Sequence, residues 1–164
     1  MKVTLKKIDR SNWREALEVK LLQSQESFVS SPVKSMAAAW VQQYGENYDY
    51  TPMGIYDGDS GHSMVGYVAT LCDPNTAGDY WIDDIMIDAR HQGKGLGRTA
   101  VAETIAYILR TYSRCEAIML SCHRNNTVAA ALYQRMGFKP TGEMNAATNE
   151  PNYKLEGEPL RKYR

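Results

Sequence analysis

The sequence predicts an α+β fold in which helices flank a mixed, mostly antiparallel central sheet. Residues 53–56 and 62–72 have the composition of two strands, and the turn-forming segment 57–61 between them indicates a hairpin. Residues 81–87 then have the composition of a buried strand, because aromatic and β-branched residues dominate them. Strands and helices alternate after this point, so the hairpin leads into a strand–helix–strand–helix–strand unit, which is typical of this fold class.

The segment before the hairpin is expected to supply one strand and two helices. Residues 3–8 alternate between apolar and polar side chains, which predicts a strand. A capping-box-like sequence starts at Asn12, so an amphipathic helix is predicted from about Trp13 to Leu21. Ser31 and Pro32 suit the N-cap and the first position of a second helix. The apolar face of this second helix is expected to consist of Met36, Ala37, Trp40 and Val41.

After the central strand, a glycine-rich turn leads into a long helix. Its apolar residues recur at helical spacing on one face, which predicts burial of that face against the sheet. These residues are Val101, Ile105, Ile108, Leu109 and Tyr112. The elements that follow are predicted at residues 117–121 (strand), 126–136 (helix), and 138–141 with 152–155 (paired strands).

Length and charge exclude several classes of protein. A chain of 164 residues is predicted to form a single domain, 1–164, with a polar tail over residues 158–164. Its 19 Lys and Arg residues balance its 19 Asp and Glu residues, whereas a nucleic-acid-binding protein should carry a basic excess. No apolar run approaches the ~18 residues that a transmembrane helix needs, so no membrane partner is expected.

The cysteines indicate a cytoplasmic protein without a metal site. Cys72, Cys115 and Cys122 are odd in number and include no Cys-x-x-Cys pair, so reduced thiols are expected. A zinc site built from these and the histidines is not expected, because Cys122 and His123 are adjacent on a predicted strand end and would point to opposite faces.

The glycine-rich turn is a predicted anion-binding loop. Gly93, Gly95 and Gly97 let the backbone turn tightly, and the first N–H groups of the following helix favour a negative charge. Lys94 and Arg98 add two positive charges, so a phosphate or pyrophosphate is the predicted ligand. The spacing Gly-x-Gly-x-Gly fits neither a P-loop, which needs Gly-Lys-Ser/Thr, nor the dinucleotide fingerprint Gly-x-Gly-x-x-Gly.

A second motif lies on the helix predicted at residues 126–136. Asn126 suits its N-cap, Leu132 its packed face and Gly137 its end. Tyr133 follows the packed Leu132 by one position, so its hydroxyl is predicted to point into a cleft; a packing role for its ring is the alternative.

The loop at residues 92–98 and the motif at residues 125–138 together resemble two signatures of the GNAT N-acetyltransferase superfamily. The resemblance is greatest to the spermidine/spermine (polyamine) N-acetyltransferases, because residues 25–29 and 82–87 also resemble segments of those enzymes. It implies the GNAT acyl-CoA N-acyltransferase fold, in which the central strand and the strand after it splay apart to admit acetyl-CoA.

The same resemblance implies acetyl-CoA as cosubstrate and no metal. The central strand would pair with the pantetheine arm, and its backbone N–H groups would stabilise negative charge on the thioester oxygen. The implied cofactor-binding residues are Ile85, Met86, Ile87, Gln92, Gly93, Lys94, Gly95, Leu96, Gly97, Arg98 and Asn126.

The chemistry requires a group that accepts a proton from the amine. An aliphatic amine with a pKa of ~10.4 is mostly ammonium at pH 7, and its deprotonation costs about 4.6 kcal/mol. Asp83 and Asp84 are the candidates, and since adjacent strand residues alternate, only one is expected to face the cleft. The resemblance favours Asp83 as the catalytic and amine-binding residue; a solvated or salt-bridged strand end is the alternative.

The remaining implied roles concern the leaving group and the amine. Tyr133 would donate a hydrogen bond or a proton to the CoA sulfur; full transfer to a thiolate is uphill by about 2 kcal/mol, because phenol is the weaker acid. Asp84, Glu26 and Phe28 would help bind the amine, although Phe28 also suits a core role.

The predicted function is transfer of acetyl from acetyl-CoA to a primary amine of a small molecule, a polyamine such as spermidine or spermine. Another amine, such as an aminoglycoside, an amino acid or a protein N-terminus, is the first alternative. A non-catalytic acyl-CoA-binding module is the second, and Tyr133 argues against it because binding alone needs no hydroxyl there. Members of the family are often dimeric, so a homodimer is a further expectation.

Overall fold

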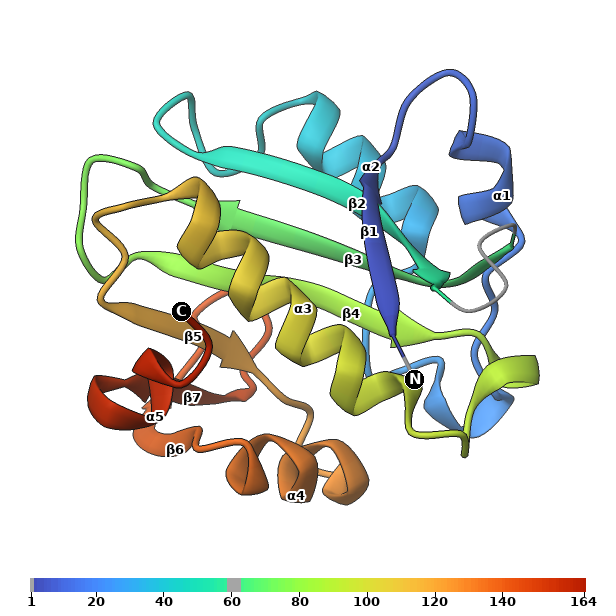
Figure 1. Cartoon of the computed structure of the whole chain (residues 1–164). Helices are drawn as coiled ribbons and strands as arrows, with labels where there is room; N and C mark the ends of the chain where they lie inside the picture. Colours follow the sequence, from blue (N-terminus) through green and yellow to red (C-terminus); the bar gives the residue numbers. More distant parts are fainter. Residues whose placement is uncertain (1, 59–62) are drawn as a thin grey trace.

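One mixed sheet forms the centre of the computed structural model, which describes residues 2–58 and 63–164 (Figure 1). Seven strands lie in the order β1-β2-β3-β4-β5-β7-β6, and all neighbours are antiparallel except β4 and β5. This confirms the predicted fold class. The strands are β1 (Val3–Lys7), β2 (Asp49–Asp57), β3 (Met64–Cys72), β4 (Tyr80–Ile87), β5 (Ala117–Ser121), β6 (Lys139–Met144) and β7 (Pro151–Glu156). The turn expected at 57–61 and the strand start expected at His62 lie largely outside the described residues.

Helices cover both faces of the sheet. Figure 1 shows α3 crossing one face, with α1 and α2 on the other. The helices are α1 (Trp13–Leu17), α2 (Pro32–Trp40), α3 (Leu96–Thr111), α4 (Thr127–Arg135) and α5 (Gly157–Arg161), with short 3₁₀ turns at Gln23–Gln25 and Ala89–His91. None of the helices in the described part of the chain is long and apolar enough to cross a membrane.

The sheet divides between β4 and β5. The two strands share a single paired position, Trp81 with Met119, and diverge beyond it. The predicted splay is therefore present, and it leaves the β5-facing edge of β4 without a strand partner along most of its length.

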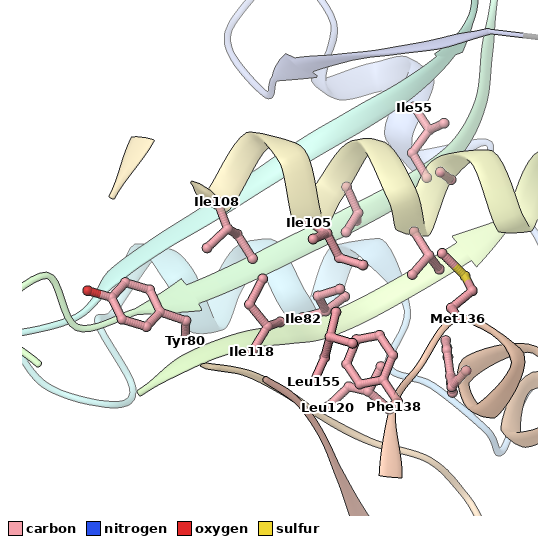
Figure 2. Close-up of a cluster of buried hydrophobic side chains, with 14 of the residues drawn as sticks. Ile55, Tyr80, Ile82, Ile105, Ile108, Ile118, Leu120, Met136, Phe138 and Leu155 are labelled. Carbon is pink, nitrogen blue, oxygen red and sulfur yellow. The ribbon is translucent and has the colours of Figure 1, made fainter. Parts of the chain in front are cut away.

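The larger hydrophobic core lies under α3 and extends to α4 and α5. Figure 2 shows Ile105 and Ile108 of α3 pointing at Ile82 and Ile118 of the sheet. These four residues are at most 2% exposed, and for Ile105 and Ile108 the helical spacing predicts this burial. A second cluster, which includes Tyr67 and Ala69 of β3, packs under α1 and α2 on the other face. The sheet is thus covered on both sides.

The apolar face predicted for α2 is wrong at Trp40 and Val41, which are 89% and 69% exposed. The helix instead buries Ser35, whose Oγ accepts a hydrogen bond from the Tyr67 hydroxyl at 2.9 Å. Trp40 lies five positions after Ser35, about 140° around the helix, so it faces solvent. The predicted start is correct, because Ser31 Oγ caps the N–H of Lys34 at 3.3 Å.

The C-terminal residues differ from the predicted polar tail. Residues 157–161 form α5, and Leu160 is only 2% exposed within the larger core. The Tyr163 hydroxyl donates to the Met136 carbonyl at 3.1 Å, and Arg164 donates to the Cys115 carbonyl at 3.2 Å. One leucine in a charged segment gives no periodic signal, yet its burial anchors the end of the chain.

The first helix also departs from prediction. The Asn12 side chain does not cap α1; it bridges the Lys7 carbonyl and the Asp9 N–H, at 3.1 and 2.8 Å. The helix ends at Leu17 rather than near Leu21, because the chain then turns toward β4, where Lys20 N–H donates to Asp88. The segment that follows is thereby directed across the sheet toward the cavity described below.

The side chain of Asp88 holds the segment that follows α1 in place where this segment crosses the sheet. Its carboxylate is 1% exposed and accepts hydrogen bonds from the N–H of Lys20 at 3.1 Å, the N–H of Arg90 at 2.9 Å and the Arg90 guanidinium at 2.8 and 3.1 Å. Burial by itself raises the pKa of Asp88, but the hydrogen bonds from Arg90 and Lys20 outweigh it and lower the pKa to about 2. The ionised carboxylate therefore stabilises the native state.

Replacing Asp88 with asparagine is expected to lower the free energy of unfolding at pH 7 by about 2 kcal/mol. A lowered pKa gives stability that is complete above the unfolded value, ~3.9, and is lost as the pH falls through about 2. In urea denaturation, the difference between the variant and the native protein should shrink as the pH falls through that range. Glu103→Gln, which breaks the exposed 2.7 Å pair with Arg110, is the control and should cost under ~0.5 kcal/mol. Equal urea midpoints for Asp88→Asn and Glu103→Gln would contradict this assignment.

Candidate active site

A cavity of about 950 Å³ lies where β4 and β5 diverge. Its walls include β4, the end of β5, the start of α3, α4 and the segment of residues 24–31. Every predicted site residue lines it except Lys94 and Arg98. The cavity thus brings together residues that are far apart in the sequence, from Glu26 to Tyr133.

The glycine loop forms one end of this cavity. Gly93 and Gly95 have φ angles of 75° and 79°, which side-chain-bearing residues rarely adopt, and the space at both Cα atoms is open. Gly95 is the N-cap of α3 and offers no side-chain cap, so the first N–H groups of the helix remain for a ligand. Lys94 and Arg98 are exposed beside the loop, and neither forms an ion pair with a described residue. This donor set fits a pyrophosphate.

The side chain of Gln92, a residue predicted to bind the cofactor, forms its hydrogen bonds within the protein. Its Nε2 donates to Gln25 Oε1 at 2.8 Å and to the Ile87 carbonyl at 2.9 Å, and Gln25 Nε2 donates back at 3.1 Å. Both amide hydrogens of Gln92 are therefore used within the protein. Gln25 has a structural importance that its sequence position did not reveal, since its partner is 67 residues away.

Asp83 and Asp84 both line the cavity, which corrects the prediction that only one of them would. Ala69 of β3 pairs with Asp84, whereas Thr70 pairs with Ile82, so Asp83 is an extra residue in β4. A β-bulge of this kind breaks the alternation of side chains between the two faces. Two neighbouring carboxylates consequently reach the same space.

Hydroxyl groups, not cations, hold these carboxylates. The Tyr50 hydroxyl donates to Asp83 Oδ2 and lies 3.5 Å from Ser35 Oγ, and Ser35 is also a hydrogen-bond partner of Asp84. No lysine or arginine nitrogen in residues 2–58 and 63–164 lies within 4.0 Å of either carboxylate. The alternative of a salt-bridged strand end is therefore excluded. The sequence did not indicate roles for Tyr50 and Ser35, because nothing in it distinguishes them from other polar residues of strands and helices.

Burial, and secondly the negative charge of Asp83, raise the pKa of Asp84 to about 7. Asp84 is only 7% exposed, so the protein offers little solvent to its charged form. Burial also raises the pKa of Asp83, against the opposing effect of the hydrogen bond from Tyr50. Asp84, with its pKa near neutral and a second carboxylate beside it, is suited to exchanging a proton with a bound amine.

Tyr133 lines the cavity from α4, although its ring belongs to the core. The ring packs edge-on against Phe138, with centroids 5.9 Å apart, and the residue is 8% exposed. Its hydroxyl has no hydrogen-bond partner among the described side chains and backbone groups. Burial, followed by the nearby Cys122 thiol, raises the pKa of Tyr133, so the hydroxyl stays protonated. Both the cleft and the packing interpretations are thus partly correct.

The remaining residues considered at the cavity are described by their contacts and exposure. Asn126 caps α4, with its Oδ1 accepting from Ala129 N–H at 3.3 Å. Phe28 lies against the His123 ring at a centroid distance of 5.1 Å, which joins the segment of residues 24–31 to the end of β5, and Glu26 lies exposed beside it. Burial raises the pKa of the Cys122 thiol to about 11, which disfavours a thiolate nucleophile. Within the part of the chain that the structure describes, no group of three potential metal ligands comes together.

An anion-binding helix N-terminus beside splayed strands, with carboxylates in the same cavity, suits a transferase that uses acyl-CoA. The chain belongs to the acetyltransferase (GNAT) family, whose sequence profile matches residues 14–138. Over 147 residues it is 33% identical to the spermine/spermidine N(1)-acetyltransferase of Bacillus subtilis (strain 168), covering 88% of this chain and 93% of that protein. The probable spermine N(1)-acetyltransferase of Bacillus subtilis subsp. natto is 32% identical with the same coverage.

Solved structures show the same fold. The spermidine N-acetyltransferase from Vibrio cholerae, solved with CoA and spermine, superposes with a TM-score of 0.71 at 19% identity, over 99% of this chain and 98% of that one. The PaiA N-acetyltransferase from Thermoplasma acidophilum, solved with coenzyme A, gives a TM-score of 0.65 at 16% identity, over 96% and 100% of the two chains. The predicted superfamily, fold and acetyl-CoA-dependent transferase class are thereby confirmed.

Proposed function

We propose that this protein acetylates a primary amine of a polyamine such as spermidine or spermine, using acetyl-CoA. The observation that carries the proposal is the pair Asp83 and Asp84, held by hydroxyl groups and with no salt-bridge partner among the described residues, in the same cavity as the anion-binding loop. Two neighbouring carboxylates that form no salt bridge with a described residue favour a cationic acceptor over a neutral or anionic one. The names of the two Bacillus subtilis relatives support the same substrate class.

The loop and the edge of β4 are assigned to the cosubstrate. The N–H groups at the start of α3, with Lys94 and Arg98, suit the phosphates. Beyond Trp81 the β5-facing edge of β4 has no strand partner, so backbone groups of Ile85 and Met86 are available to a ligand running along it. Acetyl-CoA supplies the thioester carbonyl at which the amine reacts, and these residues orient it.

The carboxylates and Tyr133 handle the protons. The ammonium group first passes one proton to the Asp83–Asp84 pair, whose higher pKa belongs to Asp84. The neutral amine nitrogen then bonds to the acetyl carbon, the carbon–sulfur bond breaks, and the second proton of the nitrogen passes to the departing CoA thiolate. Because its pKa is raised, Tyr133 acts as a hydrogen-bond donor to the departing sulfur more than as a full acid. Asp84 is thus assigned the role of base, and Asp83 that of amine ligand and charge partner.

The three cysteines are buried and unpaired, which suits a reducing compartment such as the cytoplasm. We therefore propose the cytoplasm as the compartment of the reaction.

The test is thiol release from acetyl-CoA with a panel of acceptors: spermidine, spermine, putrescine, an aminoglycoside, lysine and a peptide. The expected result is a kcat/KM for the polyamines at least ~10-fold above that of every other acceptor. Preference for an aminoglycoside or a peptide N-terminus would overturn the substrate class. Tight binding of acetyl-CoA without turnover on any amine would instead support a non-catalytic acyl-CoA-binding module.

A further inference from the structure

A wall of aromatic rings extends from the carboxylate pair toward the start of β4. The ring of Tyr44 lies 5.7 Å from that of Tyr50 and 6.5 Å from that of Tyr48, measured between centroids. Tyr44, Tyr50 and Trp81 line the cavity together with Asp83. The negative charges of Asp83 and Asp84 contribute to raising the pKa of Tyr44, after burial, which places that ring within their field. Aromatic faces beside carboxylates are the surroundings in which proteins bind ammonium groups.

This wall ends at another carboxylate, Asp79. Its Oδ1 accepts from Trp81 Nε1 at 2.6 Å, and its Oδ2 accepts from the Tyr48 hydroxyl. The hydrogen bond to Asp79 is the main reason that the pKa of Tyr48 is raised to about 12, so Tyr48 remains a donor at neutral pH. No lysine, arginine or histidine that the structure describes pairs with Asp79. Asp79 is therefore a fixed, half-buried negative charge that lacks a counter-ion, like Asp83.

The spacing between the two carboxylates suits a long linear amine. Asp79, Trp81 and Asp83 occupy alternate positions, and Asp73 N–H donates to the Asp79 carbonyl at 2.9 Å, which continues the β3–β4 ladder. Four strand steps, shortened by the bulge at Asp83, separate the Cα atoms of Asp79 and Asp83 by at most about 13 Å. At about 1.25 Å per bond, a diamine with three or four carbons spans roughly 5–6 Å, spermidine roughly 11 Å and spermine roughly 16 Å.

We propose that Asp79, with the rings of Tyr44, Tyr48 and Trp81, forms a distal ammonium subsite that selects acceptors by length. The reacting nitrogen lies at Asp83 and Asp84, a middle ammonium lies over the Tyr44 ring, and the far ammonium pairs with Asp79. Short diamines cannot reach Asp79 from the reacting position and gain nothing from it. This subsite rests on the proposed function, because the amine that it would hold reacts at Asp83 and Asp84.

The test compares kcat/KM for spermine, spermidine and 1,3-diaminopropane between the native protein and Asp79→Asn. Loss of one ion pair is expected to lower kcat/KM about fivefold for spermine and spermidine and to leave that for 1,3-diaminopropane within about twofold. Tyr44→Leu should give a similar length-dependent loss, whereas Tyr44→Phe keeps the ring face and should retain most of the activity. Equal losses on all three amines, or no loss on any, would overturn the subsite.

The matched control is Asp49→Asn. Asp49 also accepts a hydrogen bond from a tyrosine, the Tyr112 hydroxyl at 3.0 Å, but Tyr112 belongs to the core under α3. This variant removes the same charge away from the aromatic wall, so all three kcat/KM values should stay within about twofold. A length-dependent loss in this control as large as that of Asp79→Asn would show a general charge effect and would also overturn the subsite.

Calorimetric titration of spermine into the CoA-loaded protein separates this proposal from the proposed function. If the native protein binds spermine about fivefold more tightly than Asp79→Asn but turns over no amine, the catalytic proposal fails and the subsite stands. If both proteins bind spermine equally, the subsite fails, whatever the turnover.

Discussion

Phenylalanine in place of Tyr133 is expected to lower kcat about 100-fold and to change the affinity for CoA less than about threefold. The hydroxyl lines the cavity without a partner, and the cosubstrate sulfur is the group that develops charge during the reaction. An interaction made only as the sulfur departs stabilises the transition state and not the bound ground state. Steady-state kinetics with the preferred amine, together with calorimetric titration of CoA, measure the two effects separately.

Stability provides the check on Tyr133→Phe. The Tyr133 hydroxyl lines the cavity and makes no hydrogen bond within the described part of the protein, so its removal should leave the melting temperature unchanged. Tyr163→Phe is the control, because it removes a hydroxyl that donates to Met136 at the end of α4 and lies outside the cavity. That variant should keep full kcat and lose a little stability. Native kcat in Tyr133→Phe would assign Tyr133 to packing alone.

The elements that the sequence predicted well are those with strong local signals. The helix after the glycine loop has regular apolar spacing, and its buried residues Val101, Ile105 and Ile108 are those expected. Asn126 and Gly137 bound α4 because a capping amide and a left-handed φ of 103° are both local requirements. In contrast, α1 ends early because of a contact between Lys20 and Asp88, 68 residues apart, which no local pattern contains.

In the candidate site, too, features set by local motifs could be predicted and features set by tertiary contacts could not. The anion-binding loop and Tyr133 lie in short motifs and were predicted from them, whereas the arrangement of the acids depends on pairing between strands. The pairing of β4 with Ala69 and Thr70 of β3 sets the position of the β-bulge, and the bulge directs the side chains of both Asp83 and Asp84 into one cavity. The sequence of residues 82–87 alone does not indicate this bulge. Partners from other strands and helices, such as Tyr50 and Ser35, depend on the tertiary fold in the same way.

Replacing Asp84 with asparagine is expected to lower kcat/KM for spermidine about 100-fold or more, because a general base contributes at least that much. In the native protein, activity should fall as the pH decreases through about 7, since Asp84 accepts the amine proton only when it is ionised. This fall in activity toward low pH, the acidic limb of the pH profile, should be absent from the residual activity of Asp84→Asn. Initial rates between pH 5.5 and 9, at amine concentrations far below KM, report the pKa of the free enzyme.

Asp83→Asn separates the two carboxylates. The charge of Asp83 is the second cause, after burial, of the raised pKa of Asp84, so its removal should move the acidic limb to lower pH. Lys34→Gln should move the limb the opposite way, because the charge of Lys34 lowers that pKa. Tyr44, Tyr50 and Tyr67, which also face the pair, have raised pKa values and stay neutral throughout this range.

Unfolding free energies test whether these effects are chemical or structural. A buried carboxyl with a raised pKa gives stability that is complete below the unfolded value, ~3.9, and is lost as the pH rises through about 7. Asp84→Asn should therefore be as stable as the native protein, or more stable, at pH 8, while it is nearly inactive. A destabilised Asp84→Asn at pH 8, or an acidic limb that stays in place in Asp83→Asn, would assign the pair a structural role and leave the amine proton without an acceptor at this site.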